Sequence, residues 1–281
     1  MPKADLSVIG IKRGPEVFEY AWRDVVLYAL GVGARASDLP YVYERAPGGL
    51  KVLPSFAVKA ASQVFPNVGQ VEWSLFLHGE QRLVLHQPFP PQGRLVQEGM
   101  VTDIWDKGKA AVYQISINGA LEDGSPVYEG QWSIFYVGAG GFGGHPGPRA
   151  EPRHTPRDRV PEVRASQVVA ENQAALYRLS SDLNPLHIDP TAAAVGGFDR
   201  PIVHGLCTYG FAARMFVDSA LGGDVARLKE FAARFAKPVY PGDELTLQAW
   251  RQDGHYVLEA STPGGVVLAN GLAVAADQAS S

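Results

Sequence analysis

Two stretches of this chain, 150 residues apart, share one spacing of prolines and leucine. The matched positions are Pro88 with Pro238, Pro91 with Pro241, and Leu95 with Leu245. A constant offset is the mark of an internal repeat, although three matched positions alone are also compatible with chance. The spacing predicts a chain built from two copies of one structural unit.

Each proline stretch introduces runs rich in β-branched and aromatic residues. In the second, Leu245-Thr-Leu-Gln-Ala-Trp250 alternates apolar and polar positions. Such alternation is typical of antiparallel strands with one buried face. We predict strands within residues 101–105, 110–117, 132–137, 245–250, 256–260 and 266–274.

The two predicted copies are separated by residues 138–165, which contain five glycines up to Gly144 and then five prolines from Pro146 to Pro161. A stretch of this composition cannot hold a helix or a central strand. It is interpreted as a linker between halves 1–137 and 166–281. A long surface loop inside one domain remains the alternative.

Each half has one strong helix candidate. Residues 24–33 are apolar on nearly every side, which predicts a buried helix ended by Gly31 and Gly33. Residues 205–221 predict a longer helix ended by Gly222 and Gly223. A helix that precedes several strands in both halves indicates an α+β fold, with a sheet wrapped around a helix in each half.

Composition excludes several classes of protein. The net charge of −4 argues against a general nucleic-acid binder. The single cysteine, Cys207, excludes an intrachain disulfide and a cysteine-based zinc site. No apolar run is long enough to span a bilayer, the first residues do not resemble a signal peptide, and the last ones are not the Ser-Lys-Leu peroxisomal signal. We therefore expect no membrane association and a cytoplasmic location.

The candidate site is the run Asp182-Leu-Asn184-Pro185-Leu-His187. Pro185 prevents a regular helix or central strand, so the segment is a loop with three convergent polar side chains. Asp182 and His187 form a pair suited to activating water near neutral pH. Each residue alone is compatible with a structural role. The following Asp189-Pro190 pair predicts a helix cap, and Asp189 is assigned to capping.

A second candidate position, Gly205, lies at the predicted start of the long helix. Backbone N–H groups at a helix start stabilise negative charge, and a glycine lets a ligand approach closely. Gly205 is therefore a candidate oxyanion-hole donor, with tight helix packing as the alternative. His204 receives no chemical role.

Other kinds of site have weaker support. Asp182, His187, Asp189 and His204 could hold a metal, but their spacing matches no zinc signature. No Gly-x-Ser-x-Gly motif is present, and Gly138 to Gly144 do not follow the dinucleotide-binding pattern.

The run from Tyr177 to Pro190 resembles the signature of the MaoC-like hydratases, and more narrowly of 2-enoyl-CoA hydratase 2, the hydratase unit of peroxisomal multifunctional enzyme type 2. Further segments resemble the family in the same order along the chain. They are residues 24–34, 41–44, 53–56, 77–81, 138–144, 204–207 and 234–242. One departure is Ser181, where the family usually has glycine before the aspartate; it could alter the loop or the hydrogen bonding of Asp182.

The resemblance implies a double hot-dog fold, two curved antiparallel sheets each wrapped around a long helix. It implies an (R)-specific 2-enoyl-CoA hydratase, which adds water to trans-2-enoyl-CoA to give (3R)-3-hydroxyacyl-CoA. The second half would carry the catalytic loop, and the degenerate first half would accommodate the acyl chain. The implied catalytic residues are Asp182, His187, Asn184, Gly205 and Glu44; the implied substrate contacts are His78, Gly79, Lys107, Leu183, Pro185, Leu186 and Phe235. Glu44 is equally compatible with a structural ion pair.

The same resemblance implies that no metal or redox cofactor takes part and that the chain forms a homodimer, as the family commonly does. Two other functions share the substrate class: a hot-dog thioesterase, and a non-catalytic protein that binds acyl thioesters. The complete Asp-Asn-Pro-His set argues against both. Acyl length, and CoA versus acyl carrier protein, stay open.

Overall fold

The structure is a computed structural model that describes residues 2–149, 152–180 and 182–277. Its strands are β1 (Lys12–Tyr20), β2 (Phe76–Leu85), β3 (Gly93–Asp106), β4 (Ala110–Leu121), β5 (Pro126–Val137), β6 (Val163–Val168), β7 (Leu228–Phe235), β8 (Glu244–Gln252), β9 (His255–Thr262) and β10 (Gly265–Ala275). Its α-helices are α1 (Trp22–Gly31), α2 (Leu39–Val42), α3 (Phe56–Ser62), α4 (Gln173–Tyr177), α5 (Pro190–Val195) and α6 (Gly205–Leu221). All six predicted strand segments lie inside observed strands.

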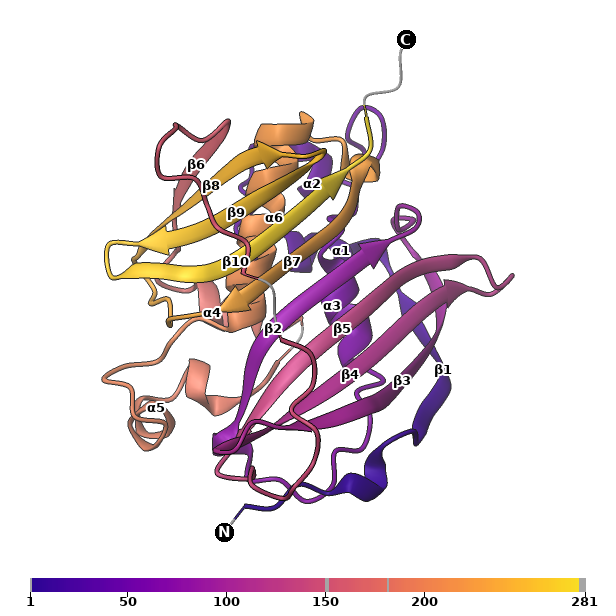
Figure 1. Cartoon of the computed structure of the whole chain (residues 1–281). Helices are drawn as coiled ribbons and strands as arrows, with labels where there is room; N and C mark the ends of the chain where they lie inside the picture. Colours follow the sequence, from indigo (N-terminus) through magenta and orange to yellow (C-terminus); the bar gives the residue numbers. More distant parts are fainter. Residues whose placement is uncertain (1, 150–151, 181, 278–281) are drawn as a thin grey trace.

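The ten strands form one sheet in the order β1-β3-β4-β5-β2-β7-β10-β9-β8-β6 (Figure 1). Read inward from one edge, the strands are β1, β3, β4, β5 and β2. Read inward from the other edge, they are β6, β8, β9, β10 and β7, so each half arranges its five strands in the same order. The duplication predicted from the proline spacing is confirmed, because the matched prolines lie in the β2–β3 and β7–β8 connections. Among the described residues, no helix has both the length and the apolar character that crossing a membrane requires.

The two halves join where β2 pairs with β7 in antiparallel register. Glu80 lies opposite Arg234, and Val84 lies opposite Glu230. Adding 150 to Glu80 gives Glu230, and subtracting 150 from Arg234 gives Val84, so the shift turns one pair into the other. An approximate two-fold axis therefore passes between Arg82 and Ala232, which are themselves paired. The axis relates each position in one half to a position in the other.

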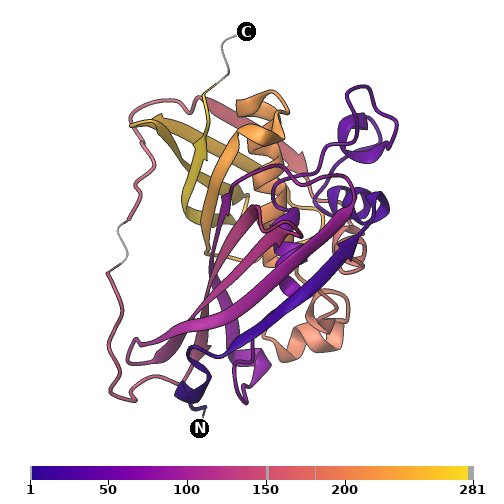
Figure 2. The same cartoon turned by 90° about the vertical axis from the view of Figure 1, so that its right-hand side faces the viewer.

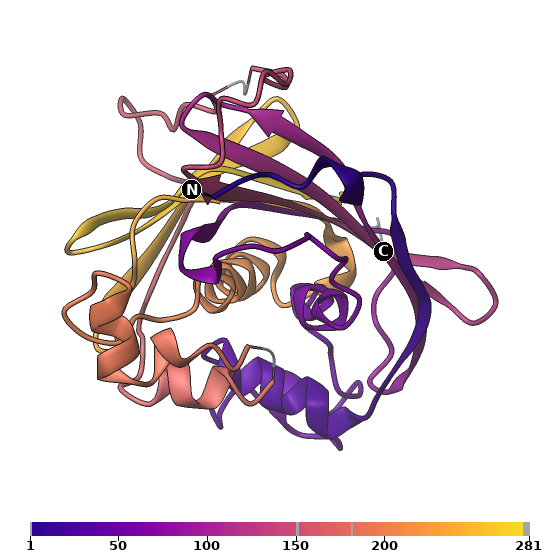
Figure 3. The same ribbon diagram turned by 90° about the horizontal axis from the view of Figure 1, so that it is seen from below.

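The curved sheet wraps around two helices, α3 and α6, one from each half (Figure 3). Both are almost fully buried. The prediction for the second half is confirmed, and the one for the first half is corrected. Residues 24–31 lie in α1, which ends at Gly31 as predicted but is only half-buried and packs mainly on α4 and α2. The helix equivalent to α6 is α3, only seven residues long. By the 150-residue shift it begins at nearly the same position as α6 and ends earlier, so the chain after Ser62 leaves the helix where the second half continues it.

The predicted linker leaves β5 at Val137 and reaches β6 at Val163, so it ends three residues earlier than predicted. Its described parts run along the side of the sheet away from the helices (Figure 2). Arg157 holds it to the second half through two hydrogen bonds to the buried Glu259 on β9, at 2.8 and 2.9 Å. The arginines between the prolines thus fasten the segment to the sheet.

A buried polar network ties α6 to the first half. Arg214 donates from Nε to the Val32 carbonyl at 3.1 Å and from Nη1 to Asp218 at 3.0 Å. Tyr41 donates to the other Asp218 oxygen at 2.6 Å. A glycine, Gly210, lets the helices approach here, since a Cβ on it would lie 2.4 Å from Val32.

We expect Arg214→Met to lower the free energy of unfolding by about 1–3 kcal/mol, because it leaves buried acceptors such as the Val32 carbonyl without a donor. Urea denaturation of the full chain measures this. The matched control is Arg94→Met, which removes an exposed ion pair with Glu122 and should change stability by less than about 0.5 kcal/mol. Equal effects of the two substitutions would show that the network does not hold the halves together.

Candidate active site

The loop after α4 is shaped by its own side chains. Asp182 Oδ1 accepts a hydrogen bond from the Asn184 N–H at 2.9 Å. Asn184 Oδ1 then accepts from the Leu186 N–H at 3.0 Å and caps the short 3₁₀ turn Pro185–His187. Two successive side-chain turns of this kind are what aspartate and asparagine favour. They deliver His187 to a fixed place.

Asp189 caps α5, as predicted: its Oδ1 accepts from the Thr191 N–H at 2.8 Å. Asn184 also acts as a cap. Its side-chain carbonyl oxygen is engaged in the turn that carries His187.

The acid and the imidazole predicted from the sequence lie together. One carboxylate oxygen of Asp182, one ring nitrogen of His187 and one of His204 lie within 4.8 Å of one another. Asp182 is exposed, whereas His187 is 8% exposed. The pair therefore combines a carboxylate open to solvent with an imidazole held in the protein.

The tautomer of His187 follows from its hydrogen bond. Its Nδ1 lies 2.9 Å from the Ile202 carbonyl oxygen, which can only accept, so Nδ1 carries the proton. The lone pair is then on Nε2. Neutral His187 can accept a proton there.

Sequence reasoning gave His204 no role, yet it lies against the predicted catalytic pair, Asp182 and His187. Its ring centroid is 3.7 Å from that of His187, and its Nε2 lies 3.0 Å from the Asp182 main-chain oxygen. It occupies the N-cap position of α6 without making a side-chain cap. A histidine where helices prefer serine, threonine or aspartate was the available signal.

Burial dominates the electrostatics of both rings. It lowers the pKa of His187 below its ordinary 6.5, against the opposing effects of the Ile202 hydrogen bond and the Asp182 carboxylate. Burial, and next the charge on His187 when that ring is protonated, lowers the pKa of His204 to about 3. Both imidazoles are therefore neutral at neutral pH.

Gly205 is the first residue of α6, so its N–H is one of those that find no acceptor within the helix. The Phe235 ring packs beside it, 3.3 Å from where a Cβ of Gly205 would lie. Phe235 touches His78 of the first half, with ring centroids 4.8 Å apart, and His78 stacks on Trp132 at 5.1 Å. The β2–β7 pairing thus brings a line of rings from the first half to the helix start.

Three other predicted substrate contacts, Gly79, His78 and Lys107, lie in the first half. Gly79 lies at an irregularity of the β2–β5 pairing, where a Cβ would come 2.3 Å from the Phe135 ring. Burial lowers the pKa of His78 to about 4, so this ring is neutral. Lys107, in the β3–β4 turn, lies 5.3 Å from the Trp105 ring. Its turn is at the end of the sheet where β2 begins.

Three further contacts predicted from the family lie along the loop itself. Leu183 is 64% exposed, Pro185 is exposed, and Leu186 is half-buried. They form the rim of the site. Ser181, where the family usually has glycine, lies outside the described residues.

The structure does not bring Glu44 to this site. Glu44 follows α2, and Tyr41 of α2 bonds Asp218 near the last turn of α6. Gly205 is at the first turn of this helix, 13 residues before Asp218, so the two are about 20 Å apart at 1.5 Å per residue. The carboxylate of Glu44 lies 3.8 Å from Arg45 Nε, which corresponds to the structural ion pair considered for it.

The arrangement of the rings argues against a metal bound by both histidines. The His187 and His204 planes are only 30° apart and nearly stacked. Nitrogen lone pairs lie in the ring plane, and zinc binds about 2.0–2.1 Å from the nitrogen. An ion between two stacked rings would lie outside both planes.

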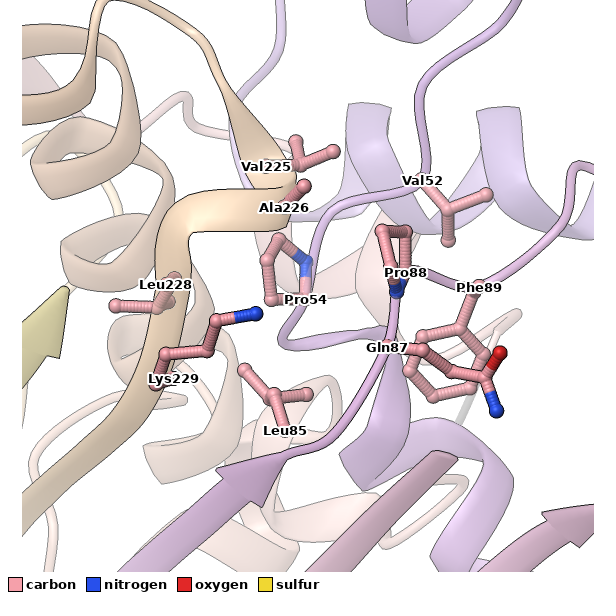
Figure 4. A pocket seen from close by; sticks show the side chains of 10 residues that line it. All are labelled: Val52, Pro54, Leu85, Gln87, Pro88, Phe89, Val225, Ala226, Leu228 and Lys229. Carbon is pink, nitrogen blue, oxygen red and sulfur yellow. The ribbon is translucent and has the colours of Figure 1, made fainter. Parts of the chain in front are cut away.

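A pocket occupies the equivalent place in the first half (Figure 4). Leu85 in it corresponds by the 150-residue shift to Phe235, and Leu228 corresponds to His78. Its lining is Val52, Pro54, Leu85, Gln87, Pro88, Phe89, Val225, Ala226, Leu228 and Lys229. These residues include no acid and no histidine, and the free volume of about 10 Å³ is roughly that of a single water site. This counterpart of the site therefore has neither the acid nor the imidazole, and it has room for about one water.

Comparison with known proteins covers both halves. Residues 18–138 match the MFE-2 hydratase 2 N-terminal domain, and residues 153–263 match the MaoC like domain. A Dictyostelium discoideum protein named "Probable enoyl-CoA hydratase 2" is 37% identical over 95% of both chains. The 3-hydroxyacyl-thioester dehydratase Y of Mycobacterium tuberculosis is 41% identical over 92% of both. The mouse peroxisomal multifunctional enzyme type 2 is 40% identical, and the chain spans 38% of its length.

Solved structures agree with the architecture. A MaoC-like dehydratase from Phytophthora capsici superposes with a TM-score of 0.88 at 28% identity, covering 98% of both chains. A Mycobacterium tuberculosis protein described as a double hotdog fold superposes with a TM-score of 0.61 over 95% of both chains. At 13% identity it shows the fold alone, and the predicted double hot-dog fold is confirmed.

We expect His187 to titrate below 6.5, and to titrate at still lower pH in Asp182→Asn, because the carboxylate raises the pKa of the ring. NMR of the imidazole signals against pH measures both values. Asp123→Asn, in the exposed β4–β5 turn, is the control and should leave His187 unchanged. A pKa that rises in Asp182→Asn would show that the two groups do not interact as their positions indicate.

Proposed function

This chain belongs to the MaoC-like family, in the two-domain form of hydratase 2, and from that premise we propose that it is an (R)-specific 2-enoyl-CoA hydratase. It adds water reversibly to trans-2-enoyl-CoA and yields (3R)-3-hydroxyacyl-CoA. The observation that carries the proposal is the meeting of Asp182 and His187 beside the start of α6. Relatives named as a hydratase and as a dehydratase describe the two directions of such a reaction.

The chemistry needs a place for negative charge. The thioester is conjugated with the C2–C3 double bond, so attack of water at C3 moves an electron pair onto the thioester oxygen. The Gly205 N–H and the positive end of the α6 dipole stabilise that oxygen. One preorganised donor of this kind typically contributes about 3 kcal/mol to the transition state.

The water is held between Asp182 and His187. Neutral His187 has its lone pair on Nε2, and the ionised carboxylate is a second acceptor, so the pair takes one proton as the C3–O bond forms. The pair then returns one proton to C2 from the same side, which makes the addition syn. Atoms balance: the hydroxyl goes to C3 and hydrogen to C2. The two residues act as one acid–base unit.

The place of the acyl group in this proposal follows from the position of the first half beside Gly205. Phe235, His78 and Trp132 form an apolar wall that leads away from Gly205, and neutral His78 adds no charge to it. Lys107 supplies a cation for a CoA phosphate. We propose that Leu183, Pro185 and Leu186 contact the thioester as it enters, and that Gly79 leaves room for the wall.

We also propose that neither a metal nor a redox cofactor takes part. Addition of water to an activated alkene changes no oxidation state of the protein, and the stacked histidines do not present converging lone pairs. The homodimer and the cytoplasmic location stay predictions; light scattering during size-exclusion chromatography measures the first, and cell fractionation the second.

Asp182→Asn and His187→Ala should each lower kcat for hydration of enoyl-CoA by about 10²–10⁴-fold, because each removes half of the acid–base unit. Loss of the conjugated enoyl-thioester absorbance measures the rate, and chiral analysis identifies the product. Asp199→Asn, an exposed residue after α5, is the matched control. Near wild-type turnover in Asp182→Asn would refute its role. Release of free CoA thiol would identify a thioesterase, and binding with no absorbance change a carrier protein.

Activity should survive dialysis against EDTA within experimental error, since no step uses a metal. The same absorbance assay, run before and after dialysis, measures this. Loss of activity that added zinc restores would overturn the metal-free mechanism.

A further inference from the structure

His204 is the one group at the site to which neither the sequence nor the mechanism above gives a task. It is 2% exposed and lies between two rings, 3.7 Å from the His187 centroid and 4.9 Å from that of Tyr177. Its backbone oxygen accepts the Thr208 N–H in the first turn of α6. The residue therefore touches the catalytic loop with its side chain and the oxyanion helix with its backbone.

The protonation of the ring follows from its neighbours. The Asp182 main-chain oxygen, 3.0 Å from Nε2, is an acceptor only, so Nε2 carries the proton and donates it. The lone pair is on Nδ1, which is buried and has no hydrogen-bond partner in the described part of the chain. A buried acceptor without a partner costs stability, so an imidazole is not the residue that stability alone would favour here.

We propose that His204 is a positioning residue of the hydration reaction: its Nε2–H holds the main chain of Asp182, and its ring is the surface against which His187 stacks. This rests on the proposed function. The acid and the base come from a short irregular loop, and their separation must be kept to a fraction of an ångström for both to reach one water molecule. His204 links the two through a single rigid ring.

The chemistry of the position explains the residue type. A phenylalanine would supply the flat ring without the donor. A glutamine would supply a donor near the Nε2 position without the ring. An arginine or lysine would place a permanent positive charge beside His187 and disfavour its protonation during the reaction. Neutral histidine is the side chain that combines ring, donor and absence of charge.

The test compares His204→Phe and His204→Gln with wild type in the enoyl-CoA assay. In His204→Phe we expect kcat to fall by about 10- to 100-fold while KM changes by less than about threefold, because the acyl and CoA contacts are elsewhere. The free energy of unfolding should stay near that of wild type, because the lost hydrogen bond is offset by removal of the unpartnered Nδ1. In His204→Gln the retained donor should make kcat about two- to tenfold higher than in His204→Phe, the worth of one hydrogen bond.

His86→Phe, at a half-exposed histidine after β2 that bonds Glu129, is the matched control and should keep full activity. A His204→Phe variant with wild-type kcat in the folded protein, or one whose loss matches its loss of stability, overturns the proposal. Equal losses in the Phe and Gln variants as large as that of His187→Ala also overturn it, since His204 would then transfer a proton itself. Because wild-type activity is measured in the same assay, failure of the proposed function is seen separately as an inactive wild type.

Discussion

The antiparallel pairing of β2 with β7 is the contact on which the active site depends. It joins the sheets of the two halves edge to edge into one sheet. It also sets the approximate two-fold axis between Arg82 and Ala232. Because of this axis, the start of β2 lies beside the end of β7, and the start of β7 lies beside the end of β2. His78 therefore meets Phe235 at the start of α6. A site made of one half's loop and helix is completed by the partner half's strand.

The same symmetry creates two such places, and the chain has developed only one. Around α6 the preceding loop supplies Asp182, His187 and His204. Around α3 the corresponding place holds Pro54, Leu85 and Phe89 and has room for about one water. The first half has a shorter inner helix, α3, and the segment before it reaches the far end of α6 through Tyr41 and Lys51. In the proposed mechanism, the first half supports the site and supplies a wall for the acyl group.

Much of this could be predicted from the sequence, because local signals dominate in the parts concerned. Alternating strands, the Asp189 cap and the Asp-Asn-Pro-His loop depend on neighbours along the chain, and the proline offset revealed the repeat. The helix within the first sheet could not be predicted, since α1 and α3 are both apolar and only the topology separates them. The place of Glu44 likewise depends on how the segment before α3 packs on α6. His204 was missed because its partners, Asp182 and His187, are 22 and 17 positions away, and no spacing rule connects them.

His187 and Asp182 have different surroundings. The imidazole is buried and hydrogen-bonded, and the carboxylate is exposed to solvent. His187 is anchored by a carbonyl, which selects the tautomer with a free Nε2, and burial lowers its pKa so that this lone pair is available at neutral pH. Asp182 is exposed, and its carboxylate raises the pKa of the His187 ring. If His187 were exposed, the imidazole would be protonated more readily and would lose its fixed direction. In the proposed mechanism, a buried imidazole beside an exposed carboxylate allows one loop to take a proton and return it on the same face of the alkene.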